Sequence, residues 1–191
     1  MNLILLRHGE TEWNLTGRMQ GVSDTKLTDV GLDQAHDAVA KMPIFSQIWS
    51  SPLQRARLTA QIIADAQGTT YTVDDRLIER SWGEWEGMLP AEVDRRWPGW
   101  RAEGRKPPGY EQDKSVYMRF QAWLTDLPLD RDPKPIAAVT HGGFMSAVVR
   151  VLGGNDTGYK NLEGVWLTDD KERLRVIRHE EFIPNARKLT R

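Results

Sequence analysis

The sequence predicts an α/β fold with a mostly parallel sheet. Short apolar runs alternate along the chain with longer amphipathic stretches, which is the order typical of strand–helix–strand units. Residues 3–6 are apolar at every position, as expected for a strand that helices cover on both faces. The amphipathic stretches also begin and end with residues that favour helix termini.

The expected helices carry their own start and stop residues. Thr28 and Ser51 suit N-caps, and Pro52 after Ser51 suits the first helical position. Gly68 suits the position just past a helix end. Met118, Ala122 and Leu124 or Thr125 recur at near-helical spacing and predict a further amphipathic helix. We expect strands at 3–6, 45–51, 69–73 and 135–139, helices at 26–42, 51–68, 110–132 and 143–154, and a hairpin at 165–178.

Length and composition limit the class of protein. The 191 residues suit a single domain, residues 1–191, with a lid insertion at about 82–108 that is rich in Trp, Gly, Pro and Arg. A net charge of -1 gives no basic field for nucleic acid, and no apolar run reaches the roughly 20 residues of a membrane helix. Without cysteine, the chain has no disulfide or thiol chemistry. We expect a soluble cytoplasmic protein, monomeric or homodimeric.

Two of the four histidines occur in the same local setting. His8 follows the apolar run Leu-Ile-Leu-Leu and one arginine, and His141 follows the apolar run Ile-Ala-Ala-Val and one threonine, each with glycine after it. Ligands of open parallel sheets bind outside the carboxyl ends of the strands, and glycine lets a ligand approach the backbone. If the two strands are neighbours, both imidazoles meet at that end of the sheet. His36, in an amphipathic helix, and His179, in the polar tail, are interpreted as structural.

Two arginines add positive charge to the same place. Arg7 precedes His8, and Arg55 falls in the first turn of a helix, where a cation opposes the helix dipole and so suggests a functional role. Two guanidinium forks beside two imidazoles suit a phosphoryl dianion. The arginines also favour a neutral imidazole, which retains the lone pair that a nucleophile needs.

A leaving oxygen also needs a proton, which a carboxylic acid can donate. Glu79, Glu84 and Glu86 all lie within the stretch RLIERSWGEWEG. Glu79 directly follows the apolar pair Leu-Ile and is the one expected near the sheet end. On residue chemistry alone this preference for Glu79 over the other two is weak.

Five stretches in order resemble the histidine phosphatase superfamily, the phosphoglycerate-mutase-like proteins. They are LLRHGETEWN, GRMQGVSDTKLTDVG, SSPLQRA, LIERSWGEWEG and VTHGG, and they extend the resemblance from Leu3 to about Gly154. The resemblance implies a three-layer α/β sandwich with a small lid insertion. It also implies a metal-independent phosphomonoesterase of the histidine acid phosphatase type that needs no cofactor and acts on a small phosphorylated metabolite.

The resemblance also implies individual roles. His8 matches the histidine that becomes phosphorylated, and Glu79 matches the proton donor. The remaining matched positions are Arg7, Arg55 and His141 of the phosphate pocket, and Asn14, Gln20, Gly21 and Gly142 of the phosphate- or substrate-binding set. Arg80 and Ser81 stand where the family often has a hydrophobic residue, so substrate contacts there are expected to differ.

The insertion and the reaction each leave alternatives open. Trp82, Trp85, Trp97 and Trp100 form either a small core or a stacking surface for the leaving group. The basic residues there form either a solvated face or a mouth that attracts an anionic substrate; they are Arg95, Arg96, Arg101, Arg105 and Lys106.

The sequence leaves three alternatives to a phosphatase. One is a mutase of the phosphoglycerate mutase type, which the short span between Glu79 and His141 disfavours. Another is a metal site formed by His8, His141 and Glu79, which the nearby arginines disfavour. The third is a non-catalytic phosphate-binding module, which should have lost His8 or Glu79.

Overall fold

The computed structural model describes residues 2–127, 133–169 and 173–183. In these ranges a six-stranded sheet has the order β3-β2-β4-β1-β5-β6. The first four pair in parallel, and β5 and β6 are antiparallel. The strands are β1 (Asn2–Arg7), β2 (Gln47–Ser50), β3 (Thr72–Val73), β4 (Ile136–Thr140), β5 (Glu163–Asp169) and β6 (Leu174–Glu181).

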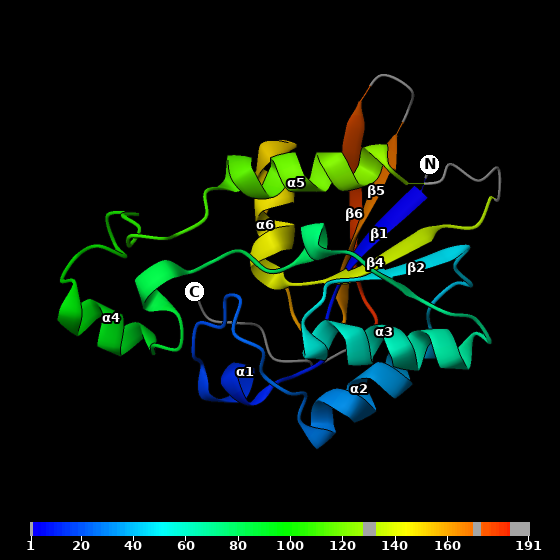
Figure 1. The fold of residues 1–191 in the computed structure, drawn as a ribbon, viewed down its shortest axis with the longest axis horizontal. Coiled ribbons are helices and arrows are strands. Elements are labelled where there is room, and N and C mark those ends of the chain that lie inside the picture. The colour runs from blue at the N-terminus through cyan, green and yellow to red at the C-terminus, as the bar shows by residue number, and fades with distance from the viewer. Residues whose placement is uncertain (1, 128–132, 170–172, 184–191) are drawn as a thin grey trace.

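Helices cover both faces of the sheet (Figure 1). Alternate residues of β1 divide between the two sides, because successive side chains of a strand point to opposite faces. Leu3 and Leu5 pack against α5 and α6, and Ile4 and Leu6 pack with residues of α2 and α3. The predicted three-layer α/β sandwich is therefore confirmed. The α-helices are α1 (Glu12–Thr16), α2 (Asp29–Val39), α3 (Gln54–Ala66), α4 (Pro90–Arg96), α5 (Asp113–Thr125) and α6 (Gly142–Val151), and the 3-10 turns are η1 (Asp75–Leu77) and η2 (Gly83–Trp85).

Two terminus predictions are confirmed, and two are wrong, because α3 begins at Gln54 and neither Ser51 nor Pro52 takes its predicted position. Thr28 caps α2 by accepting a hydrogen bond from the backbone of Gly31, and Gly68 follows α3 with φ +65°. Ser51 does not cap α3, which begins at Gln54 after Leu53. The Ser51 hydroxyl instead lies 2.7 Å from the His141 ring, so the segment 51–53 stays extended before the helix starts.

Two other predictions need correction. In α5, the buried side chains are Val116, Phe120 and Trp123, whereas Met118 is 60% exposed. The two large rings pack edge-on against Phe144 and Trp49 respectively and so set the inner face of the helix. The expected strand at 69–73 is reduced to the two residues of β3, and part of the expected helix 110–132, residues 128–132, falls outside the described residues.

The histidines outside the strand-end pair also differ from each other. His36 is exposed on α2. His179 belongs to β6 rather than to a polar tail, and its ring stacks on Tyr159 at 5.6 Å between ring centroids. Both remain outside the site described below.

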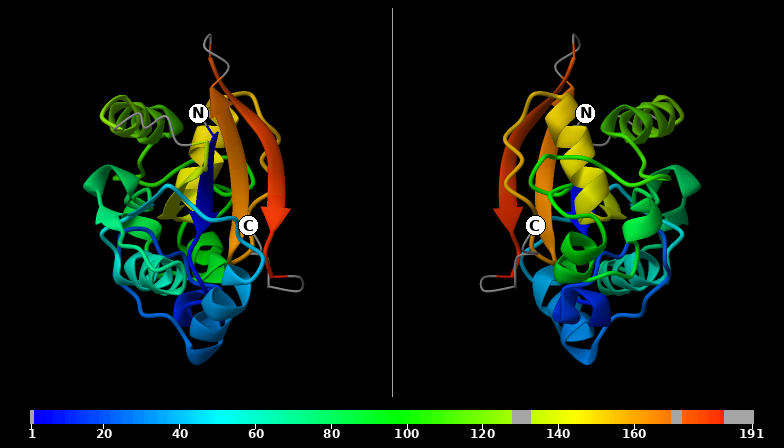
Figure 2. Two further views of the ribbon diagram at one scale, coloured as in Figure 1. Left: turned by 90° about the vertical axis from the view of Figure 1, so that its right-hand side faces the viewer. Right: turned by 90° about the vertical axis from the view of Figure 1, so that its left-hand side faces the viewer.

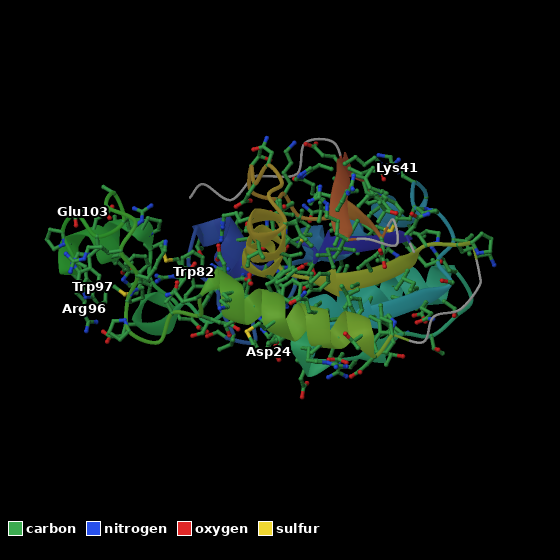
Figure 3. The ribbon with its side chains drawn as sticks, turned by 90° about the horizontal axis from the view of Figure 1, so that it is seen from above. Asp24, Lys41, Trp82, Arg96, Trp97 and Glu103 are labelled. Carbon is green, nitrogen blue, oxygen red and sulfur yellow. The ribbon has the colours of Figure 1, made fainter. Side chains whose placement is uncertain are left out.

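The insertion at 82–108 projects from one end of the sheet, with α4 at its outer side (Figures 1 and 2). Trp82 lies near the sheet domain, whereas Arg96, Trp97 and Glu103 lie at the far end (Figure 3). Trp85 is buried and packs with Trp97 at 6.3 Å between ring centroids, and Trp97 in turn contacts Trp100. These rings form a small aromatic core of the insertion.

Within the described residues, none of the helices combines the length and the apolar character that crossing a membrane requires.

Candidate active site

The two strand-end histidines meet at the carboxyl end of the sheet. His8 follows β1 and His141 follows β4, and these neighbouring parallel strands align Arg7 with Thr140. The two ring centroids are 5.1 Å apart. Both rings are buried, with exposed fractions of 2% and 0%. The register of two strands far apart in sequence therefore builds the centre of the site.

Hydrogen bonds fix the tautomer of His8. Its Nδ1 lies 2.7 Å from the carbonyl of Gly9, which can only accept, so Nδ1 carries the proton and Nε2 the lone pair. The Nε–H of Arg55 donates to Nε2 at 3.2 Å. Burial, and then the charges of Arg55 and Arg7, hold the pKa of His8 well below its usual range. His8 is a neutral imidazole with its lone pair on the buried side of the site.

Arg55 is anchored by backbone carbonyls. It is the second residue of α3, and its two terminal nitrogens donate to the carbonyls of Ser23 and Gly21 at 2.7 and 2.8 Å. Burial lowers the pKa of Arg55 to about 10, so the guanidinium keeps its charge at neutral pH. Gly21 contacts Arg55 from behind, with φ +53°, and is not among the residues that line the cavity.

Arg7 supplies the second guanidinium. One terminal nitrogen donates to the carbonyl of Tyr159 at 2.7 Å, and burial lowers the pKa of Arg7 to about 10. His141 stands at the N-cap of α6, with Nε2 2.7 Å from the hydroxyl of Ser51. Burial, then Arg55 and His8, hold the pKa of His141 well below its usual range. In the described part of the chain, Arg7 Nε and His141 Nδ1 are among the buried polar atoms without a hydrogen-bond partner, and both belong to this site.

Glu79 lies at the edge of this group, two residues after η1. Its side chain is 7% exposed and lines the same cavity as Arg7 and His8. Oε1 accepts from the backbone N–H of Arg80 at 2.8 Å, and Oε2 accepts from that of Gly143 at 2.9 Å. A Cβ on Gly143 would lie only 2.8 Å from Oε1, so the glycine makes room for the carboxyl.

The other predicted binding residues surround His8. Asn14 lines the cavity, and its Oδ1 accepts from Asn161 at 3.1 Å. Gln20 also lines the cavity and donates to the Thr11 hydroxyl. Gly142 lines the cavity beside His141.

Several contacting residues escaped sequence reasoning. Asn161 donates to the carbonyl of His8 at 3.0 Å, and the Tyr159 carbonyl binds Arg7. Both lie more than 150 residues from their partners, and no local pattern marks them. Ser51 is a further case, because its capping signal concealed its contact with His141.

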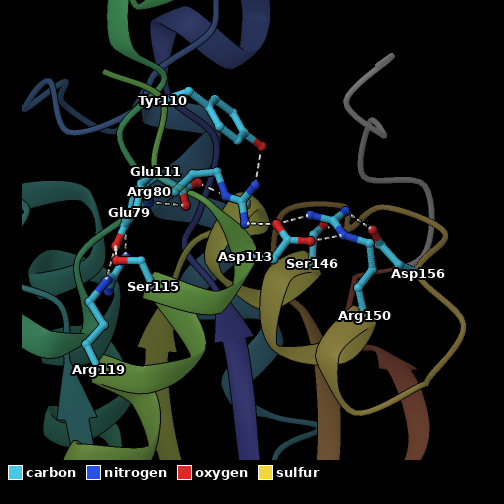
Figure 4. Close-up of polar contacts among 11 residues, drawn as sticks. Glu79, Arg80, Tyr110, Glu111, Asp113, Ser115, Arg119, Ser146, Arg150 and Asp156 are labelled. Atoms are coloured by element: carbon cyan, nitrogen blue, oxygen red, sulfur yellow. Dashed lines mark hydrogen bonds and ion pairs between the residues drawn. The ribbon is translucent and has the colours of Figure 1, made fainter. Parts of the chain in front are cut away.

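The site opens into a cavity of about 1090 Å³, far larger than a phosphate group. Arg80, which is only 1% exposed, forms an ion pair of 2.5 Å with Asp113, and Asp113 also binds Arg150 at 2.6 Å (Figure 4). Tyr110 accepts a hydrogen bond from Arg80 (Figure 4). This ion-paired wall joins the loop after Glu79 to α5 and α6, and all four side chains line the cavity.

The lid contributes only part of its basic residues to the cavity. Arg101 and Lys106 line it, whereas Arg95, Arg96 and Arg105 do not. Arg101 is paired with Asp94 at 2.8 Å. Trp82 and Trp85 line it as well. Trp85, Trp97 and Trp100 therefore pack together as a core, and Trp82 and Trp85 also line the cavity. A role of the rings or of Arg101 and Lys106 in binding a substrate stays a prediction.

Among the residues that the structure describes, no group of three His, Asp or Glu side chains is placed to hold a metal ion. The nearest candidate set, His8, His141 and Glu79, shares its position with Arg7 and Arg55. Their charges repel a cation and attract an anion. The chemistry of this donor set favours a phosphoryl group.

Comparison with known proteins agrees with the fold. Residues 3–169 match the histidine phosphatase superfamily (branch 1). A glucosyl-3-phosphoglycerate phosphatase of Mycolicibacterium vanbaalenii is 37% identical over 80% of this chain and 74% of its own length. A probable phosphoglycerate mutase GpmB of Yersinia pestis is 35% identical over 81% of this chain and 75% of its own. The structure of a mycobacterial glucosyl-3-phosphoglycerate phosphatase in complex with VO3 superposes with a TM-score of 0.82 at 30% identity, covering 92% of this chain and 96% of that one.

The two histidines at the strand ends of this sandwich, with two buried guanidinium groups beside them, suit an enzyme that acts on phosphoryl groups. The chain belongs to the histidine phosphatase superfamily. Within that family it is a phosphomonoesterase.

Proposed function

We propose that the chain hydrolyses phosphomonoesters of small metabolites through a covalent phosphohistidine on Nε2 of His8. One observation carries the proposal. A neutral His8 with its lone pair on Nε2 lies beside two buried, charged guanidinium groups and within the same cavity as Glu79. This combination supplies a nucleophile, charge stabilisation and a proton donor.

In the first step, Nε2 of His8 attacks phosphorus and the ester P–O bond breaks in line. The equatorial oxygens bind to Arg7, Arg55 and His141. Glu79, in its carboxylic acid form, gives its proton to the leaving oxygen, so that an alcohol departs. The proton stays on Nδ1, which donates to the Gly9 carbonyl, and this hydrogen bond holds the ring in place.

In the second step, water attacks the phosphoenzyme. The carboxylate of Glu79 takes one proton from that water, the P–N bond breaks, and inorganic phosphate leaves. His8 recovers its lone pair and Glu79 its proton, so the cycle closes without an external acid or base. The buried guanidinium groups stabilise the charge on the phosphoryl oxygens in both transition states.

The leaving group is a polar metabolite rather than a simple alcohol. The cavity extends well beyond the phosphate pocket, with Trp82 and Tyr110 for contact with a flat or sugar-like group. Arg101 and Lys106 at the lid favour additional negative charge on the substrate. The substrate in the name of the glucosyl-3-phosphoglycerate phosphatases combines a sugar with additional negative charge. We propose that no nucleic acid or membrane takes part, and that the chain acts as a monomer or homodimer.

Loss of labelling tests the proposal. Incubation with a ³²P-labelled phosphomonoester and rapid quenching should trap an acid-labile phosphoprotein in the native chain. His8→Ala should abolish both label and turnover, because it removes the imidazole nitrogen that lies beside Arg55. Full labelling of the His8→Ala protein would overturn the assignment of the nucleophile.

A phosphoglycerate mutase activity is the second candidate, favoured by the basic residues Arg101 and Lys106 at the cavity. A mutase must hold its phosphohistidine away from water and return the phosphoryl group to a bound intermediate. Incubation with 3-phosphoglycerate, with both products followed, separates the two. We expect free phosphate to accumulate; rapid conversion to 2-phosphoglycerate with little phosphate would establish the mutase instead.

A further inference from the structure

Glu86, at the start of the lid insertion, faces away from the cavity toward the loop that anchors Arg55. It follows η2 and is half-buried. Its Oε1 accepts two hydrogen bonds from Ser23, one from the backbone N–H at 2.5 Å and one from the hydroxyl at 2.6 Å. A carboxylate with two close donors is a strong acceptor.

The same carboxylate packs against the backbone of Gly21. A Cβ at Gly21 would lie 2.2 Å from Oε2 of Glu86, and the backbone there has φ +53°. Only glycine combines this conformation with this close approach. The carboxyl of Glu86 thus touches both residues of the loop whose carbonyls bind the guanidinium.

Those two carbonyls place Arg55. Ser23 O and Gly21 O accept from the terminal nitrogens of Arg55, and Arg55 Nε reaches His8. A continuous set of short contacts therefore runs from Glu86 through the loop and Arg55 to Nε2 of His8. In addition, backbone hydrogen bonds join Met19 to residues 87 and 88, so this loop and the lid insertion are fixed together at that point.

We propose that Glu86 is a positioning residue that sets Arg55 against the phosphoryl group by holding the carbonyls of Gly21 and Ser23. This role rests on the proposed function of Arg55 in binding the phosphoryl oxygens. A guanidinium with a misplaced anchor still carries its charge but loses the geometry on which fork-like binding of an anion depends. The lid insertion then contributes to catalysis from behind the pocket as well as through its cavity wall.

Glu84 is the matched control. It lies two residues earlier in the same insertion, its side chain is 47% exposed, and it pairs with Arg96 at 3.7 Å. It has no contact with the 19–23 loop among the interactions described. Loss of Glu84 therefore reproduces the removal of one carboxylate from the insertion without touching the anchor of Arg55.

The test compares Glu86→Ala, Glu86→Gln and Glu84→Ala. Binding of inorganic phosphate is measured by calorimetry, and kcat and KM are measured on p-nitrophenyl phosphate. We expect Glu86→Ala to weaken phosphate binding about tenfold or more, the effect of losing hydrogen bonds to a charged acceptor, with KM rising alongside. Glu86→Gln keeps an accepting oxygen and should restore most of the affinity, and Glu84→Ala should bind phosphate as the native chain does.

Two results would overturn the role of Glu86. One is a folded Glu86→Ala protein that binds phosphate as tightly as Glu84→Ala. The other is an equal loss in Glu86→Gln and Glu86→Ala, which would show that charge rather than the contacts to Ser23 matters. If Glu86→Ala does not fold, Ser23→Ala takes its place: weaker phosphate binding supports the proposal and unchanged binding overturns it. Phosphate binding is read without turnover, so an error in the proposed reaction, visible as absent labelling of the native chain, is distinguishable from an error about Glu86.

Discussion

Gly143 offers a way to move the proposed acid without changing its chemistry. The backbone N–H of Gly143 donates to Oε2 of Glu79, and the residue is the second of α6. Alanine fits its helical backbone, and the intrinsic gain in helix propensity is about 1 kcal/mol. The new methyl group, however, would lie 2.8 Å from Oε1 and 3.0 Å from Oε2 of Glu79, and 3.0 Å from Cγ of Arg80. Gly143→Ala should therefore fold and displace the carboxyl of Glu79 together with the aliphatic part of Arg80.

The size of the effect follows from that geometry. Restoring an ordinary 3.4 Å contact requires the carboxyl of Glu79 to move by about 0.4–0.6 Å. A misplacement of 1 Å can cost roughly a hundredfold in rate, so half of that displacement should cost about tenfold. The ceiling is the complete contribution of a general acid, about 10²–10⁴-fold, which Glu79→Gln would measure.

The assay is the ratio of kcat/KM for p-nitrophenyl phosphate and for an alkyl phosphate. Nitrophenolate leaves without protonation, whereas an alkoxide does not, so Gly143→Ala should lower the second rate about tenfold more than the first. Gly142→Ala is the control for this ratio, because its Cβ makes only ordinary contact with Arg7, at 3.5 Å, and does not approach Glu79. Equal losses on both esters in Gly143→Ala would refute the placement of Glu79 as the acid.

Two stability predictions follow from the buried charges. His8 and His141 have lowered pKa values in the folded state, so the unfolded chain binds more protons than the folded chain below about pH 6.5. The free energy of unfolding should therefore be greatest above that pH and fall by up to about 1.4 kcal/mol per histidine at pH 5.5. Urea titrations in which His8→Asn shows no smaller pH dependence than the native chain would contradict this. Asp113→Asn leaves the buried guanidinium of Arg80 with one ion pair fewer and should cost about 2 kcal/mol in urea unfolding at pH 7, between the values for exposed and buried pairs; an unchanged midpoint would show that the pair contributes nothing. The Arg150 and Arg80 partners also lower the pKa of Asp113 to about 2, so this difference should persist above about pH 4 and shrink as the pH falls toward 2.

The sequence predicted the arrangement of the sheet better than the details of its helices. Apolar runs at 3–6 and 136–139 identify two strands because every position in them is buried. The inner face of α5 was missed because Met118 and Ala122 follow helical spacing as well as Phe120 and Trp123 do. Spacing selects a helix, but the area of large rings selects the face that is buried.

The pair His8 and His141 could be predicted for a geometric reason. Both follow apolar strands, and the carboxyl ends of parallel strands share one edge of a sheet. The groups that hold Arg7 and His141 in place could not be predicted, because they are a backbone carbonyl and a hydroxyl that no sequence pattern marks. The carbonyl of Tyr159 and the hydroxyl of Ser51 are of this kind. Such groups become visible only when strand register and loop paths are known.

The three glutamates of residues 79–86 show how the fold separates residues that the sequence presents as equivalent. Glu79 follows the 3-10 turn that ends at the buried Leu77, and it accepts from Gly143 at the start of α6, which places it in the cavity. Glu84 lies on the surface of η2 beside Arg96, and Glu86 turns back to Ser23. Their side chains are chemically identical, so the direction in which each one leaves the backbone decides its surroundings. The proposed proton donor, a solvent-exposed ion pair and the proposed anchor for the Arg55 loop thus arise within eight residues because the backbone points each carboxylate toward a different partner.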